Sequence, residues 1–155
     1  MDVAHIFSLG IFFFLSGAAA AQLPLSKVRN FSYLFSLAGA ALFLTAGIFL
    51  LFSPAFIGPT IPITSVFSFA FSGDALSAFF VVLISLVTIA VSIYSVGFSR
   101  LVRNSGYLGF FYTILILSMY GVVLSSNIIT FLVCWETMAV AAYFLVVFDR
   151  NAESA

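Results

Sequence analysis

Charged residues divide this sequence into long uncharged runs, and their spacing limits what the chain can fold into. Five acidic and five basic residues are present. The uncharged runs between them cover residues 6–26, 30–73, 75–99 and 104–135. A helix needs about 20 apolar residues to span the hydrocarbon core of a bilayer. Each run can therefore supply at least one membrane-spanning helix.

The composition agrees with an integral membrane protein. Hydrophobic residues make up 64% of the 155 residues and charged residues only 6%, whereas about a quarter of a soluble domain is charged. The single cysteine, Cys134, excludes a disulfide within the chain and a cysteine metal site, and the single histidine, His5, excludes a multi-histidine site. The formal net charge of zero gives no reason to expect a nucleic-acid partner.

The runs predict five helices in a single membrane domain that covers residues 1–155. The expected helices cover residues 5–23, 31–52, 75–98, 107–124 and 127–148. Residues 53–73 contain three prolines and then alternate apolar with small polar residues, which predicts an outer loop with a β-hairpin. The expected fold class is an all-α integral membrane protein with about five transmembrane helices and a short β-hairpin-like outer loop.

The first apolar segment has an alternative interpretation as a cleaved signal peptide. Its residues 18–21 are all alanine and resemble a cleavage region. The four residues at the start of the chain carry no positive charge, which the first region of a signal peptide should have. We therefore favour a helix that is retained.

The basic residues predict how the helices are oriented. Lys27 and Arg29 follow the first expected helix, Arg100 and Arg103 follow the third, and Arg150 follows the fifth. With five crossings, all of these positions fall on one side of the membrane. Basic residues concentrate on the cytoplasmic side. We therefore expect a multi-pass protein of the cell membrane with its N-terminus outside and its C-terminus in the cytoplasm.

The fifth expected helix carries a carboxylate near its middle. Glu136 lies nine residues after Asn127 and twelve before Phe148, which places it ~13 Å from the outer helix end at 1.5 Å per residue. A charge at that depth costs ~2.5–3.5 kcal/mol on insertion scales. Ionisable residues in a membrane normally face a protein interior or a water-filled cavity and have a function. Glu136 is therefore the candidate proton-transfer residue, buried in the assembled protein.

The surroundings of Glu136 on its helix are almost wholly apolar. Residues at helical spacing on the same face are Leu132, Val133, Ala139, Val140 and Tyr143. Tyr143 is the only polar group among them, so it is a second, weaker proton-transfer candidate. The expected helices contain no basic residue, and a cationic partner must come from outside these segments. The alternative is a protonated Glu136 that is bound by a neighbouring helix and serves structure only.

Other singled-out residues have simpler interpretations. Asp74 precedes the third expected helix, where a carboxylate accepts backbone amide hydrogens and caps the helix. Trp135 is expected to pack in the core, and Cys134 is expected to be an inert small apolar residue. His5 is expected near the outer surface at headgroup level, with proton entry as the alternative.

Two stretches resemble a known family. They are GDALSAFFVVLISLVTIAVSIYSVGF at 73–98 and GFFYTILILSMYGVVLSSNIITFLVCWETMAVAAYFLVVFD at 109–149. They resemble the antiporter-like membrane subunits of respiratory complex I, Mrp-type cation/proton antiporters and group 4 membrane-bound hydrogenases. The sequences of the two stretches are most similar to hydrogenase-4 component B. The resemblance covers about residues 65–150, in what would be the N-terminal third of such a subunit.

The resemblance implies a role in coupled proton or cation translocation. The family's fifth-helix glutamate belongs to the translocation machinery, and this role carries over to Glu136. The family's key lysines lie in later helices, and the only lysine here, Lys27, is in an expected loop. The chain is therefore either a fragment of a longer subunit or a naturally short relative, and the glutamate needs a cation from elsewhere.

The resemblance also sets expectations for partners and chemistry. We expect other membrane subunits of a respiratory or hydrogenase-type complex, and lipid, as partners. The chain has no motif of a catalytic centre, so redox chemistry would reside in partner subunits that hold iron–sulfur clusters and, in a hydrogenase, a nickel–iron site. No cofactor is expected on this chain. The alternative function is a structural membrane subunit that bridges its neighbours without transporting ions.

Overall fold

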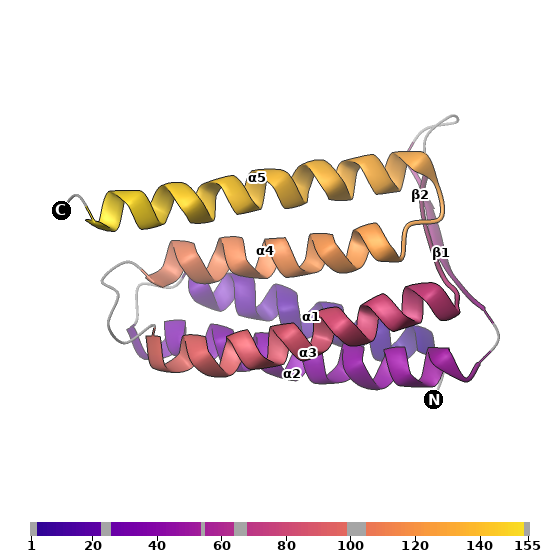
Figure 1. Ribbon diagram of the computed structural model, residues 1–155, viewed down its shortest axis with the longest axis horizontal. Helices are drawn as coiled ribbons and strands as arrows, with labels where there is room; N and C mark the ends of the chain where they lie inside the picture. The colour runs from indigo at the N-terminus through magenta and orange to yellow at the C-terminus, as the bar shows by residue number, and fades with distance from the viewer. Residues whose placement is uncertain (1–2, 23–25, 54, 64–67, 99–104, 154–155) are drawn as a thin grey trace.

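Five long helices run side by side, and a small β-hairpin lies across one end of them (Figure 1). The structure is a computed structural model that describes residues 3–22, 26–53, 55–63, 68–98 and 105–153. The elements in chain order are α1 (Val3–Ala21), α2 (Ser26–Leu51), β1 (Phe56–Pro62), β2 (Ser68–Gly73), α3 (Ala75–Phe98), α4 (Ser105–Val123) and α5 (Ile128–Glu153). The first described residues lie at the hairpin end and the C-terminal end of α5 lies at the other (Figure 1).

The predicted fold class is confirmed. Each of the five helices contains an apolar segment of 18 to 23 residues that is long enough to cross a membrane. The chain is a multi-pass membrane protein. The two-stranded hairpin is the only regular β-structure in the described residues apart from one isolated bridge.

Two helices extend by five residues beyond the bounds that the sequence predicts. α2 begins at Ser26 rather than at residue 31, and α5 continues to Glu153 rather than ending at Phe148. The expected basic loop therefore includes residues of α2, among them Lys27 and Arg29, and Arg150 belongs to α5. Lys, Arg and Glu are good helix formers, so α2 and α5 can continue as helix beyond their apolar segments. Arg100 and Arg103 lie outside the described residues.

The hairpin forms where prolines interrupt the helical pattern, as predicted. β1 and β2 pair antiparallel, from Phe56 opposite Gly73 to Pro62 opposite Ser68. The register is irregular between Ile57 and Thr60, where Gly58 and Pro59 interrupt the pairing. Proline lacks the backbone donor that a central strand needs, and it is tolerated on an edge strand such as β1.

Glycines let α1 and α2 approach closely. A Cβ atom added at Gly10 of α1 would lie 2.6 Å from the Phe43 ring, and one at Gly39 of α2 would lie 2.8 Å from the Phe14 ring. The two phenylalanines are buried and pack edge-to-face with ring centroids 5.9 Å apart. Phe43 also stacks on Tyr120 of α4 at a centroid distance of 4.0 Å. The core therefore lies where α1, α2 and α4 meet.

Buried hydroxyl groups join α3 to α4. Ser85 Oγ and Tyr120 Oη lie 2.8 Å apart, and Ser92 Oγ and Tyr112 Oη lie 3.0 Å apart. Ser85 Oγ donates its hydrogen to the Val81 carbonyl oxygen at 2.7 Å, so it accepts the hydrogen of Tyr120. All four side chains are buried. Polar groups in the membrane interior are thus satisfied between neighbouring helices without any charge.

We expect Ser85 and Tyr120 to be energetically coupled. In a double-mutant cycle with Ser85→Ala and Tyr120→Phe, the coupling in the free energy of unfolding should be about 1 kcal/mol, the usual worth of a hydrogen bond between transmembrane helices. Reversible unfolding in bicelles measures it. A matched cycle of Tyr120→Phe with Thr45→Val should show no coupling, since Thr45 bonds only to the Leu42 carbonyl of its own helix. Equal couplings in the two cycles would contradict the assignment.

Candidate functional site

Helix α5 is the least covered helix of the bundle. Only 11% of its membrane-spanning residues are buried, against 28% to 39% in the other four helices. It packs along α4 and touches strand β2 at its beginning, so it lies at the outside of the bundle (Figure 1). One face of α5 is therefore left open by the described part of the chain.

Small side chains on α5 form the face that packs on α4. Thr130 and Ala141 are buried, and Cys134 is half-buried between them. A Cβ atom added at Gly121 of α4 would lie 2.6 Å from Cys134 Sγ, so the glycine permits the close approach of the two helices. Cys134 has the expected role of a small packing residue. Burial among apolar groups is the ordinary environment of an unreactive cysteine.

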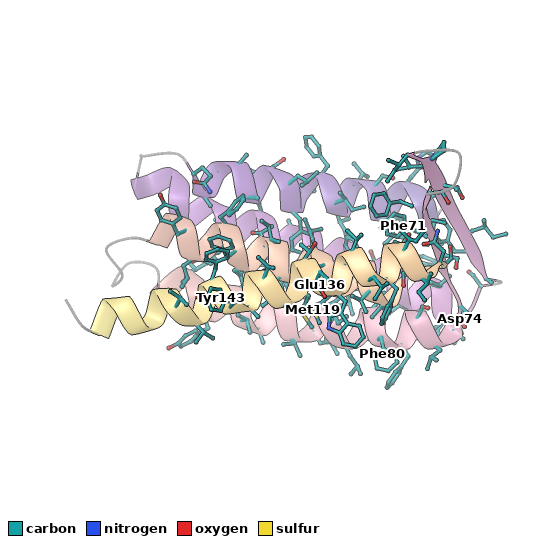
Figure 2. All side chains as sticks on the ribbon, turned by 90° about the horizontal axis from the view of Figure 1, so that it is seen from above. Phe71, Asp74, Phe80, Met119, Glu136 and Tyr143 are labelled. Carbon is teal, nitrogen blue, oxygen red and sulfur yellow. The ribbon has the colours of Figure 1, made fainter. Side chains whose placement is uncertain are left out.

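Glu136 lies on the open face of α5. It follows Cys134 by two residues, which corresponds to about 200° around the helix, and its side chain is exposed. Figure 2 shows Glu136 near the middle of the bundle's length and Tyr143 further along α5. Within the part of the chain that the structure describes, no hydrogen bond or ion pair reaches the Glu136 carboxylate. Its depth in the membrane stays a prediction.

The expectation that Glu136 is buried is not met by this chain alone. The reason is that α5 has only α4 and the hairpin as its main neighbours. The same arrangement corrects the prediction for Trp135, which is 51% exposed instead of packed in the core. Its indole contacts the ring of Phe131 edge-to-face at a centroid distance of 5.2 Å.

The residues predicted to share a face with Glu136 do so. Leu132, Val133, Ala139, Val140 and Tyr143 are all exposed. Tyr143, at 63% exposure, packs edge-to-face against Phe144. It follows Glu136 by seven residues, about 10.5 Å along the helix axis, so the two polar groups share a face without being hydrogen-bond partners. Their roles in proton transfer stay predictions.

The beginning of α5 is tied to the hairpin by a group of hydrogen bonds that sequence reasoning missed. Asn127 Nδ2 donates to the Ser68 carbonyl oxygen at 2.7 Å, and Thr130 Oγ1 accepts from the Ala70 amide at 3.0 Å. The turn before α5 continues this pairing, because Ser126 N donates to the Ala70 oxygen and Ser72 N donates to the Leu124 oxygen. The turn thus completes the free edge of β2.

Asn127 also caps α5. Its Oδ1 accepts a hydrogen bond from the Thr130 amide at 2.8 Å, and asparagine is among the best N-cap residues. An Asn three residues before a polar residue at the head of an apolar run was therefore a usable signal for the cap. The bond to Ser68 spans 59 residues of sequence, and no local pattern indicates it.

Asp74 caps α3 at the hairpin end of the bundle. Its Oδ1 accepts a hydrogen bond from the Ser77 amide at 2.8 Å, which is the geometry of an N-cap. The hydrogen bond from the Ser77 backbone, followed by that from the Ser77 side chain, lowers the pKa of the Asp74 carboxyl below its ordinary value of 3.8. His5, in the first turn of α1, is exposed, and α1 begins at the hairpin end of the bundle (Figure 1).

An apolar crevice of about 330 Å³ lies between α1, α4, α5 and the hairpin. Phe7, Phe56, Phe71, Tyr120 and Cys134 are among the residues that line it. No charged residue lines the crevice, and Glu136 does not reach it. Among the described residues, no three His, Cys, Asp or Glu side chains gather where a metal ion could bind. The open face of α5 with Glu136 is therefore the candidate site.

About half of the chain is similar to a hydrogenase component and to subunits of quinone oxidoreductases. It is 36% identical to hydrogenase-4 component B of Escherichia coli over 83 residues, which are 52% of this chain. It is 35% identical to subunit 5 of the chloroplast NAD(P)H-quinone oxidoreductase of Anthoceros angustus over 92 residues, or 58% of the chain. It is 31% identical to NADH-ubiquinone oxidoreductase chain 5 of Ascaris suum over 78 residues, or 50% of the chain.

The predicted resemblance is thereby confirmed for about half of the chain. The matched segments make up only 12%, 12% and 14% of the lengths of these three relatives. No protein-family model matches the chain.

The Asp74 cap predicts a dependence on acid pH. Because the pKa is lowered in the folded state, the cap stabilises α3 above pH 3.8 and this stabilisation is lost as the pH falls through the lowered pKa. Hydrogen exchange of the Ser77 amide should therefore show weaker protection in acid. Asp74→Ala should expose this amide at neutral pH, whereas Asp74→Asn should keep the cap and lose the pH dependence. Protection that is independent of pH in the native chain would contradict this role.

The contact between Gly121 and Cys134 predicts a compensating pair of substitutions. Gly121→Ala should destabilise the packing of α5 on α4 by ~1–3 kcal/mol, the usual cost of overpacking, because its Cβ would press on the cysteine sulfur. Adding Cys134→Ala should restore most of the loss. Unfolding in bicelles measures the four members of the cycle, and additive effects would contradict the close contact.

Proposed function

We propose that this chain is a membrane subunit, or part of one, of an energy-converting redox complex, in which Glu136 contributes to coupled proton or cation translocation. The observation that carries the proposal is a carboxylate in the middle of a membrane span, on a face that the described residues of this chain leave open. The relatives support it, because their names describe subunits of a hydrogenase and of quinone oxidoreductases.

A comparison of exposed faces favours a protein partner on α5 rather than lipid. The outward face of α3 carries apolar residues such as Leu76, Phe80 and Leu83, which suit hydrocarbon. Exposed tyrosines occur on both helices, Tyr94 on α3 and Tyr143 on α5, but the open face of α5 also carries the carboxylate of Glu136. A carboxylate that faces lipid is costly, and such residues face protein or water-filled cavities. A transmembrane segment of a neighbouring subunit, or a further segment of a longer polypeptide, would remove this cost.

The chemistry of such an interface follows from the charge. A partner segment that presents a lysine or arginine at the depth of Glu136 would stabilise the ionised carboxylate, and removal of the cation would favour proton uptake. Alternation between these two states lets the carboxyl group accept and release a proton. Tyr143, two turns further along the same face, is a weaker candidate for the same path.

Location and partners follow as parts of the proposal. The positively charged residues near the ends of α1, α3 and α5 favour an orientation with the N-terminus and hairpin outside and the C-terminus in the cytoplasm. The start of α2 and the end of α5, which carry Lys27, Arg29 and Arg150, lie at the end opposite the hairpin (Figure 1). The membrane would be the cell membrane. Iron–sulfur clusters, and nickel–iron in a hydrogenase, would reside in partner subunits.

A second candidate function is a structural subunit that bridges its neighbours. The large exposed aromatic surface on α5, including Trp135 and Phe144, would favour helix packing without any ion transfer. In that case Glu136 would stay protonated and donate one hydrogen bond to its neighbour. The two candidates differ in what happens when the carboxyl group becomes an amide of the same shape.

Glu136→Gln separates the two functions. In the assembled complex in sealed vesicles, we expect the substitution to lower the rate of ion translocation at least about tenfold, because an amide cannot transfer a proton as a carboxyl group does. The amount of assembled complex should stay unchanged. Asp74→Asn makes the same chemical change at a helix cap outside the spans and should leave translocation at the native rate.

Unchanged translocation in Glu136→Gln would overturn the translocation role and leave the bridging role in its place. A Tyr143→Phe variant measured alongside should show a smaller loss if Tyr143 belongs to the path.

A further inference from the structure

The hydrogen bonds between α5 and the hairpin include more than the one bond that caps the helix. Asn127 uses Oδ1 to cap α5 and Nδ2 to bind the Ser68 carbonyl oxygen. Thr130, on the first turn of α5, accepts from the Ala70 amide and is fully buried. One residue on each side of the helix start is thus bound to the same edge of β2.

The rest of α5 contacts α4 through small and apolar residues, including the close approach of Cys134 to Gly121 and the stacked rings of Phe144 and Phe111. Apolar contacts of this kind are less directional than hydrogen bonds. Hydrogen bonds depend on distance and angle, so the bonds from Asn127 and Thr130 select one register. A shift of α5 by one residue corresponds to 1.5 Å along the axis and 100° around it. Such a shift would move Glu136 along the axis and rotate it into the direction that Trp135 or Thr137 now takes.

We propose that Asn127 and Thr130 are positioning residues, which set the depth and rotation of Glu136 in the membrane by tying the first turn of α5 to strand β2. The inference rests on the translocation role proposed for Glu136, which lies six residues beyond Thr130 on the same helix. The hairpin itself is held on the bundle by the Ser72–Leu124 and Ser126–Ala70 backbone bonds, so it is a fixed reference for α5.

Three substitutions separate the hydrogen bonds to β2 from the capping of α5 and from side-chain packing. Thr130→Val keeps the shape of the side chain and removes the acceptor for Ala70. Thr130→Ser keeps the hydroxyl and should rescue the function. Asn127→Asp keeps an oxygen to cap the Thr130 amide but places an acceptor opposite the Ser68 carbonyl oxygen. The matched control is Thr45→Val, because Thr45 bonds only to the Leu42 carbonyl of its own helix.

The first measurement is the depth of position 136. A nitroxide is attached to the thiol introduced by Glu136→Cys in a Cys134→Ala background, in the membrane-inserted chain. Its accessibility to oxygen and to a water-soluble nickel chelate gives the depth. We expect Thr130→Val and Asn127→Asp to change this depth, and Thr130→Ser and Thr45→Val to leave it unchanged. An unchanged depth in both of the first two variants would overturn the proposal, whether or not they assemble with partners.

The second measurement is ion translocation by the assembled complex, per amount of complex, with Glu136 in place. We expect Thr130→Val and Asn127→Asp to lower the rate about tenfold or more, since small misplacements of a reacting group are costly, and Thr130→Ser and Thr45→Val to keep it. If Thr130→Val and Asn127→Asp kept the native rate while Glu136→Gln still lost translocation, the positioning role of Asn127 and Thr130 would be overturned and the proposed function of Glu136 would stand. A native rate in Glu136→Gln would instead overturn the proposed function. The depth measurement does not depend on that function.

Discussion

The need to satisfy polar groups in hydrocarbon governs this structure. Inside the bundle the need is met by neutral hydroxyl groups, which donate to carbonyls of their own helices and accept from the tyrosines of α4. Ser85 bonds in this way to Val81 and Tyr120. The Thr88 hydroxyl donates to the Ile84 carbonyl oxygen, and Tyr112 donates to the Thr88 carbonyl oxygen. Among the described residues, no charged side chain is buried in that interior. Glu136 stands apart because the described residues supply it with no partner, and this contrast supports the proposal that the functional site lies on its face of α5.

The hairpin relates this open face to the rest of the bundle. Its strand β2 is bonded on one edge to β1 and on the other to the turn between α4 and α5. α3 begins directly after β2 with the Asp74 cap, so two helices start from the same small sheet. Figure 2 shows Phe71 and Asp74 together at this end, away from Glu136. The hairpin end of the bundle is thus ordered by directional hydrogen bonds, and the length of the bundle is packed mainly by apolar contacts.

The sequence was sufficient for the five helices and for the hairpin. Ten charged residues in 155 and a few prolines divide the chain so clearly that the spans and the hairpin follow from membrane thickness. The sequence could not predict which faces are buried, because helices that are apolar on all sides carry no amphipathic signal. Trp135 was therefore placed in the core, and burial of Glu136 was expected. The bonds from Asn127 to Ser68 and from Thr130 to Ala70 join distant segments, and only the fold brings them together.

The two features that the sequence could not show belong to one arrangement. α5 can leave a long face open only because it contacts few neighbours, and a helix with few apolar contacts is poorly fixed along its axis. The hydrogen bonds at its start offset this deficit where the helix meets the hairpin. An open face for a partner and a directional tie at one end are therefore complementary. The first leaves Glu136 accessible to a neighbouring segment, and the second keeps it at a defined depth until that neighbour is in place.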